Sequence, residues 1–225
     1  MSTFRIIKGS QAKEADRYAI EEMKIPSLTL MENASRYVTD AAKRIADADA
    51  PVLVCSGIGN NGADGLCAAC MLHEEGYGNI TVVICGEEEN ATPEWQHQME
   101  AYTGTGLPLV RFDENTDIND LVPEPAVLID ALFGIGLHRP VKGLVKTLIE
   151  QINLTKGWIL SVDIPSGIDS DTGEMKGEAV RADETVTFGC RKTGLCARPG
   201  EKYAGRIRIV DIDIPEEAYL HAVEL

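Results

Sequence analysis

Short, continuous apolar runs recur along the chain and alternate with segments of helical periodicity. In the segment that opens after Ile25-Pro26-Ser27, for example, apolar residues recur at helical spacing from Leu30 to Ala41. The alternation predicts a parallel sheet with helices on both faces, a Rossmann-like three-layer α/β/α sandwich with a mostly parallel sheet. Strands are expected at 51–57, 79–86, 107–112, 126–134, 158–167, 184–189 and 205–215, and helices at 10–23, from 27 onward, and at 62–75, 92–104 and 141–152.

No segment rich in proline, serine or glycine divides the 225 residues, and no repeat is present. We therefore expect one domain over residues 1–225, since this length suits a single large α/β domain.

Charge and hydropathy narrow the possible partners. The net charge is −15, a field that repels phosphate backbones, so nucleic acid is not an expected partner. No apolar run reaches the roughly 18 residues that cross a bilayer, so a membrane is not expected either. The polar N-terminus has no signal-peptide pattern, which predicts a cytoplasmic protein. The six cysteines, including the Cys67/Cys70 pair inside a helical pattern, are expected to be reduced thiols.

The first candidate loop, 57–65, reads GIGNNGADG and directly follows a predicted strand. Its Gly-x-Gly-x-x-Gly spacing suits a close approach of backbone to phosphate at a helix N-terminus. The spacing alone is a weak signal. Asn60, Asn61 and Asp64 add three polar side chains, which serve either a ligand or merely turn and cap geometry.

Two further loops follow predicted strands, and both begin with an acid. Asp130 ends one apolar run, and the loop after it brings Arg139 and Lys142 into an otherwise acidic protein. Asp163 ends the next run and is followed by Pro165-Ser166-Gly167. A carboxylate in such a place is either solvated or functional, because burial without partners is costly. The four histidines show no zinc-ligand spacing, and no hydrolase or P-loop nucleotide-binding motif is present.

Taken together and in order, these loops resemble the YjeF N-terminal domain family, the NAD(P)H-hydrate epimerases. The matching segments are LMENAS (30–35), GIGNNGADG (57–65), DALFGIGLHRPVKG (130–143), VDIPSGIDSDTG (162–173), TVTFGCRKTGL (185–195) and GRIRIVDIDIP (205–215). They span nearly the whole chain. Two small departures are Ala63, where the family usually has glycine, and Ser35, where it prefers glycine.

The resemblance implies an isomerase that interconverts the R and S epimers of NAD(P)HX, a nicotinamide dinucleotide hydrated at C6. A separate dehydratase would consume the S epimer, and the kinase-like dehydratase domain that many relatives carry is not expected here. The resemblance also implies K⁺ as cofactor and a homodimer.

The same resemblance assigns residues. It implies a potassium site at Asn61, Asp130 and Ser166, and it makes Asp130 and Lys192 the candidates for catalysis. Asp130 is expected to matter more for turnover than for folding. The residues expected to bind substrate are Asn60, Asn61, Gly62, Ala63, Asp64, Gly134, Ile135, Gly136, Leu137, His138, Arg139, Pro140 and Asp163.

Two other functions stay open at this stage. A Rossmann oxidoreductase would use the 57–62 glycines, with Glu87 or Glu88 on the ribose. A non-catalytic dinucleotide-binding or dimerisation module of the same fold would have no need of the polar side chains in the loops.

Overall fold

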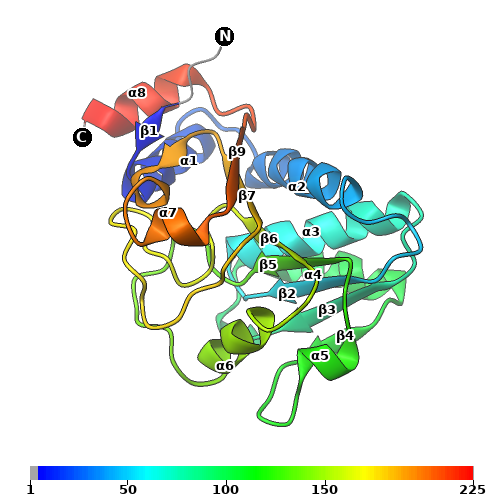
Figure 1. Ribbon diagram of the computed structural model, residues 1–225. Helices are drawn as coiled ribbons and strands as arrows, with labels where there is room; N and C mark the ends of the chain where they lie inside the picture. Colours follow the sequence, from blue (N-terminus) through cyan, green and yellow to red (C-terminus); the bar gives the residue numbers. More distant parts are fainter. Residues whose placement is uncertain (1–4, 225) are drawn as a thin grey trace.

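A computed structural model describes residues 5–224 and contains one seven-stranded sheet, in which every neighbouring pair of strands is parallel (Figure 1). The strand order is β4-β3-β2-β5-β6-β7-β9. This confirms the predicted α/β fold. The strands are β2 (Val52–Ser56), β3 (Ile80–Ile84), β4 (Leu109–Arg111), β5 (Val127–Ala131), β6 (Trp158–Val162), β7 (Glu184–Phe188) and β9 (Arg206–Val210).

Helices cover both faces of the sheet because alternate residues of each central strand point to opposite sides. Val52 and Val54 of β2 join the core under the larger helical layer, whereas Leu53 and Cys55 join the core on the other face. The larger layer contains α2 (Ser27–Lys43), α3 (Asn60–Glu74) and α4 (Pro93–Thr105), and the smaller one α5 (Ile118–Leu121) and α6 (Gly143–Ile152).

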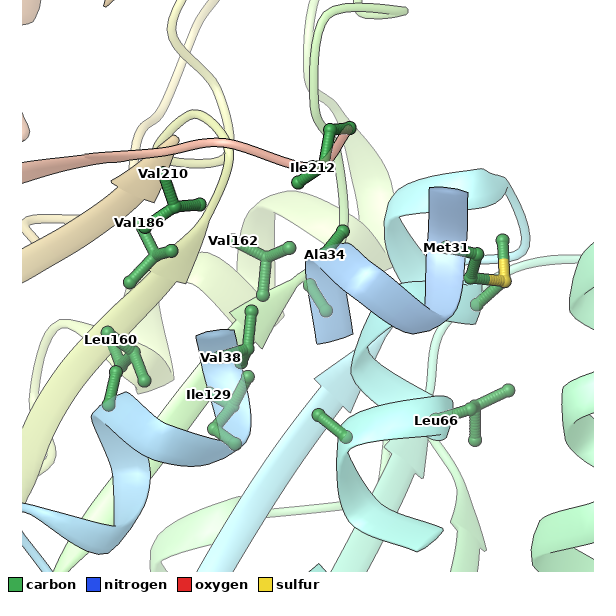
Figure 2. Close-up of a cluster of buried hydrophobic side chains, with 14 of the residues drawn as sticks. Met31, Ala34, Val38, Leu66, Ile129, Leu160, Val162, Val186, Val210 and Ile212 are labelled. Atoms are coloured by element: carbon green, nitrogen blue, oxygen red, sulfur yellow. The ribbon is translucent and has the colours of Figure 1, made fainter. Parts of the chain in front are cut away.

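Helix α2 shows how the apolar spacing seen in the sequence is used. Figure 2 shows Ala34 and Val38 of α2 facing Ile129, Leu160 and Val162 of the central strands. Val38, Ile129, Leu160 and Val162 are fully buried. Burial of such side chains stabilises the fold by about 1.5–3 kcal/mol each, and it fixes the height at which α2 sits over the strand ends.

The first and last described elements of the chain pack against each other. Near the N-terminus, β1 (Ile6–Ile7) pairs with β8 (Arg191–Lys192), and α1 (Gly9–Glu21) packs against α8 (Glu216–Glu224) beside the β9 edge (Figure 1). The sequence analysis predicts α1 but no element after 215, and it also misses α5, β1, β8 and α7 (Gly200–Tyr203). These are short or rest on tertiary contacts, which periodicity does not reveal.

Candidate active site

The strand order reverses between β2 and β5, and the site forms at that point. From β2 the chain moves outward through β3 and β4, then returns to place β5 on the other side of β2. In such sheets ligands bind outside the carboxyl ends of the strands at the switch point. The loops after β2, β5 and β6 are the three predicted from the sequence to carry function.

In the loop after β2, two of the three glycines of the Gly-x-Gly-x-x-Gly spacing are needed for close approach. A Cβ on Gly57 would lie 2.1 Å from the carbonyl oxygen of Leu132, and one on Gly62 would lie 2.0 Å from the carbonyl oxygen of Gly57. A Cβ on Gly59, the N-cap of α3, would meet nothing within 4 Å. The turn therefore presses against the loop after β5 and leaves the first N–H groups of α3 at the site.

Asp130, in β5, is fully buried and held by hydrogen bonds. Its Oδ2 accepts from the Ser161 hydroxyl at 2.7 Å and from the Ser166 N–H at 2.9 Å, and its Oδ1 accepts from the Leu132 N–H at 3.4 Å. Burial raises the pKa of Asp130, and the hydrogen bonds from Ser166 and Ser161 act against that rise. We refer to Asp130, Ser161 and Ser166 as the Asp130 cluster.

The residues implied to bind potassium gather around Phe133 and Gly134. The Ser166 hydroxyl accepts from the Phe133 N–H at 2.9 Å and lies 3.3 Å from the Phe133 carbonyl oxygen. A Cβ on Gly134 would lie 2.8 Å from Oδ1 of Asn61, so this glycine leaves room for the amide. Asn61 Nδ2 is buried without a hydrogen-bond partner among residues 5–224, which is uncommon for a buried polar atom.

Asp163, directly after β6, pairs with Lys192. The Lys192 Nζ donates to Asp163 Oδ1 at 2.5 Å, to the Thr187 hydroxyl at 3.1 Å and to the Phe188 carbonyl oxygen at 2.9 Å. Asp163 has φ = 64°, a left-handed conformation that is uncommon for a non-glycine residue. Both side chains are buried. All three N–H groups of the ammonium are therefore committed.

A cavity of about 130 Å³ opens between α1, α2, α3 and the Asp163–Lys192 pair. Five residues singled out from the sequence line it: Asn60, Asp64, Ile135, Asp163 and Lys192. The other lining residues are mainly apolar, and the remaining polar ones are Asp16, Ser27, Glu94 and Tyr219.

Several predicted residues do not line this cavity. Asp130 and Ser166 lie deeper, at full burial, and Gly62 and Ala63 offer only backbone to a ligand because they are buried within α3. The Leu137 side chain packs in the core under α6, whereas Gly136 and His138–Pro140 are exposed. The predicted substrate-binding loop thus has one apolar contact in the cavity, Ile135, and an exposed remainder.

Asp16, on α1, is a cavity residue that the sequence analysis misses. A usable signal was present: Ala12, Ala15 and Ala19 share the buried face of α1 with it at helical spacing. Burial raises the pKa of Asp16 to about 7; the charge of Asp163 adds to the rise and the Lys192 ammonium opposes it. Burial also raises the pKa of Asp64 well above its ordinary value, again with help from Asp163 and Asp16.

The two departures from the family pattern are accommodated. Ala63 lies within α3, where the backbone is helical, so its methyl group needs no unusual φ. Ser35 is buried, and its hydroxyl donates to the carbonyl oxygen of Asp64 at 3.1 Å. The serine therefore ties α2 to the helix that carries Asp64.

Among residues 5–224 no group of three or more His, Cys, Asp and Glu side chains could hold a metal ion. All six cysteines are free; Cys70 is partly buried and Cys196 is exposed. In the same part of the chain, no helix is long and apolar enough to cross a membrane.

Comparisons with known proteins show what the whole chain is similar to. The family model of the YjeF-related protein N-terminus matches residues 27–194. A protein of Limosilactobacillus fermentum named NAD(P)H-hydrate epimerase is 39% identical over 209 residues, which cover 93% of this chain and 97% of that protein. One of the same name from Oenococcus oeni is 34% identical over 211 residues, covering 93% of this chain and 97% of that protein.

A solved structure supports the fold. The crystal structure of the yeast protein ynu0 superposes with a TM-score of 0.82, covering 97% of this chain and 93% of that one. The sequence identity is 23%, so this likeness bears on the fold alone.

Proposed function

The chain belongs to the family of YjeF-related proteins, defined by their N-terminal domain, and from this premise we propose that it is an NAD(P)H-hydrate epimerase. It is an isomerase that interconverts the R and S epimers of NAD(P)HX. The observation that carries the proposal is the cavity: Asn60, Asp64, Ile135, Asp163 and Lys192, singled out by the family motifs, line one hollow at the switch point of the sheet.

The cavity suits one ring of the substrate. Its volume of about 130 Å³ is below the roughly 300–1,000 Å³ of pockets that enclose a whole drug-sized ligand. Leu30, Met31 and Ile212 give it apolar walls for the hydrated nicotinamide ring. The pyrophosphate would then lie outside, at the N-terminus of α3 and the exposed loop that carries Arg139.

The chemistry fits the charges. C6 of the hydrated ring bears both a hydroxyl and the ring nitrogen, so loss of the hydroxyl as water leaves an iminium cation. Water can return on either face. Asp16, Asp64 and Asp163 outnumber Lys192 on the cavity walls, and acidic groups aimed at a developing cation lower the barrier to its formation.

A potassium ion belongs to the proposal as well. The donors fit it: Asn61, Asp130 and Ser166 offer amide, carboxylate and hydroxyl oxygens, the kind of ligand that K⁺ takes. The buried Asn61 amide has an unpartnered end, and the assignment of its oxygen and nitrogen can reverse. A bound ion would supply positive charge among these three side chains. Asn61, Asp130 and Ser166 would then hold the loops after β2, β5 and β6 together.

Neither Asp130 nor Lys192 is well suited to transfer a proton, and the reasons differ. Asp130 is fully buried and does not line the cavity, which favours a holding role. Burial lowers the pKa of Lys192, but the charge of Asp163 and its hydrogen bond to the ammonium act against that effect, and the pKa is raised overall. A lysine that stays protonated with three committed N–H groups positions Asp163 and is a poor base.

The test is a coupled assay. R-NADHX is supplied together with a dehydratase specific for the S epimer, and consumption of the R epimer is followed with and without the protein. We expect the protein to speed consumption far above the spontaneous rate. An unchanged rate, with circular dichroism showing folded protein, would overturn the proposal. A functional link to a dehydratase, a homodimer and a cytoplasmic location remain predictions.

The rival functions find less support. Glu88, the candidate ribose acid of an oxidoreductase, forms an ion pair with Arg111 at 2.5 Å on the rim of the sheet. A binding module would have no use for the amide, carboxylate and ammonium groups of Asn60, Asp64, Asp163 and Lys192 in one cavity. Hydride transfer by the protein, seen as a change in the absorbance of reduced nicotinamide, would reinstate the oxidoreductase.

A further inference from the structure

Helix α1 contributes one carboxylate, that of Asp16, to the cavity. The sequence analysis assigns Asp16 no role: its candidates for catalysis are Asp130 and Lys192. Asp16 is partly buried and lines the cavity beside Ala12. Its helix is held over the site from two sides, by the pairing of β1 with β8 and by the packing of α8 on α1. Its position is therefore built by the fold.

Asp16 and Asp64 differ from Asp163 and Glu94, the other two acids of the cavity, in what they bind. Asp163 accepts from Lys192, Thr187 and Phe188, and Glu94 accepts from the Ser27 hydroxyl at 2.8 Å. Neither the Asp16 nor the Asp64 carboxylate makes a hydrogen bond or an ion pair with any residue from 5 to 224; the Ser35 hydroxyl bonds only the backbone oxygen of Asp64. A partly buried carboxylate without protein partners has its oxygens available to a ligand.

The surroundings of Asp16 set its protonation. The titratable groups that share its cavity are Lys192 of β8, Asp163 after β6, Asp64 of α3, Glu94 of α4 and Tyr219 of α8. Burial raises the pKa of Asp16 to about 7, so that both protonation states are populated near neutral pH. An acid/base group works best when its pKa lies near the working pH.

We infer that Asp16 is the catalytic acid/base residue that exchanges a proton with the hydroxyl and water at C6. The inference rests on the proposed epimerase function. Protonated Asp16 gives its proton to the C6 hydroxyl; the C–O bond breaks, its electrons leave with water, and the nitrogen lone pair forms the C=N bond.

The return step reverses these changes. Water oxygen bonds to C6, the C=N electrons go back to nitrogen, and one proton of that water passes to the Asp16 carboxylate. Addition to the face opposite the one that lost the hydroxyl gives the other epimer. Atoms and charge balance, and no oxidant or co-reactant is needed.

The experiment compares Asp16→Asn, Asp16→Glu and a matched control, Glu22→Gln, which changes an exposed carboxylate at the C-cap of α1. Rates of epimerisation are measured with S-NADHX and with R-NADHX over a range of pH. We expect kcat of Asp16→Asn to fall about 10²–10⁴-fold with KM nearly unchanged. The inflection near neutral pH should disappear. Asp16→Glu should recover part of the loss, and Glu22→Gln should match the parent protein.

The outcomes separate the two claims. If the parent protein itself does not epimerise, the proposed function fails and the inference falls with it. If the parent is active and Asp16→Asn keeps its kcat, or changes KM alone, the inference is overturned while the function stands. If Asp16→Asn does not fold, Asp16→Glu decides: a moved pH inflection supports the inference, and an unmoved one overturns it.

Discussion

Two acids near the same strand ends have opposite surroundings. Asp130 is fully buried, and three hydrogen bonds satisfy its carboxylate. Asp16 is partly exposed in the cavity, with no protein partner among residues 5–224. A carboxylate whose oxygens accept hydrogen bonds from several loops holds those loops together. A carboxylate without protein partners at a cavity has its oxygens available to accept hydrogen bonds from a substrate. From this contrast we infer that the Asp130 cluster has a structural role and that proton transfer takes place in the cavity.

The largest expected effect concerns Lys192, which lines the cavity but is itself buried and paired with Asp163. Lys192→Met keeps a side chain of similar length but removes the ammonium group. Asp163 is then charged and buried without its partner. Breaking a buried ion pair in this way costs about 3–5 kcal/mol, so the free energy of unfolding in urea should fall by that amount. Lys156→Met, which removes an exposed ion pair with Glu124, is the matched control and should change stability by at most about 1 kcal/mol. Similar losses for both variants would contradict the positioning role of Lys192.

Asp130→Asn tests the structural role of the Asp130 cluster. The amide keeps the shape but turns an NH₂ group toward a backbone N–H that now donates to the carboxylate. Leaving a buried donor unsatisfied costs about 1–3 kcal/mol, so this variant should unfold at lower urea concentration. This expected cost gives Asp130 a role in folding, and its role in turnover stays a prediction. An unchanged midpoint, with the exposed control Asp49→Asn also unchanged, would show that the Asp130 cluster is not structural.

Asp16→Asn should raise the free energy of unfolding, whereas Asp130→Asn should lower it. The pKa of Asp16 is about 7 in the folded protein and 3.8 in the unfolded chain, so the folded state binds more protons between these values. Stability then falls as pH rises from about 4 to about 7, and the fall is complete above pH 7. Removing the charge should raise the free energy of unfolding by roughly 1–3 kcal/mol at pH 8 and by little at pH 4. Equal effects at both pH values would show that burial of Asp16 carries no electrostatic cost.

The smallest expected effect is a dependence on potassium. If Asn61, Asp130 and Ser166 hold the ion, the melting temperature should be higher in potassium than in lithium at equal ionic strength, because a ligand of the folded state stabilises it. Gly134→Ala should weaken that difference, since its Cβ would press on Asn61 at 2.8 Å. Gly136→Ala, with open space around its Cβ, should leave it intact. A melting temperature that is identical in both salts would count against the potassium site.

The sequence predicts the sheet well because buried parallel strands are continuous apolar runs. Asp130 and Asp163 are found for the same reason, as acids at the ends of such runs. The pairing of Asp163 with Lys192 cannot be predicted in this way. It joins residues that are far apart in the chain, and it depends on the left-handed backbone at Asp163 and on the turn from β7 to β8.

The places of Asp16 and Tyr219 in the cavity cannot be predicted from the sequence for a related reason. Both lie on terminal helices whose place over the cavity comes from tertiary packing, α1 on α8 and β1 on β8. Helical spacing puts Asp16 on the buried face of α1 beside Ala12, Ala15 and Ala19. An acid on an otherwise apolar helical face was the available signal, but the spacing does not say what that face covers.

The most direct test of the account follows the two epimers themselves. Pure S-NADPHX is incubated with the protein, and the R and S forms are separated and quantified over time by chromatography. The account predicts that the mixture reaches its equilibrium composition much faster than without protein, and that Asp16→Asn slows this approach while Glu22→Gln does not. A composition that drifts only at the spontaneous rate, in the presence of folded parent protein, would contradict it.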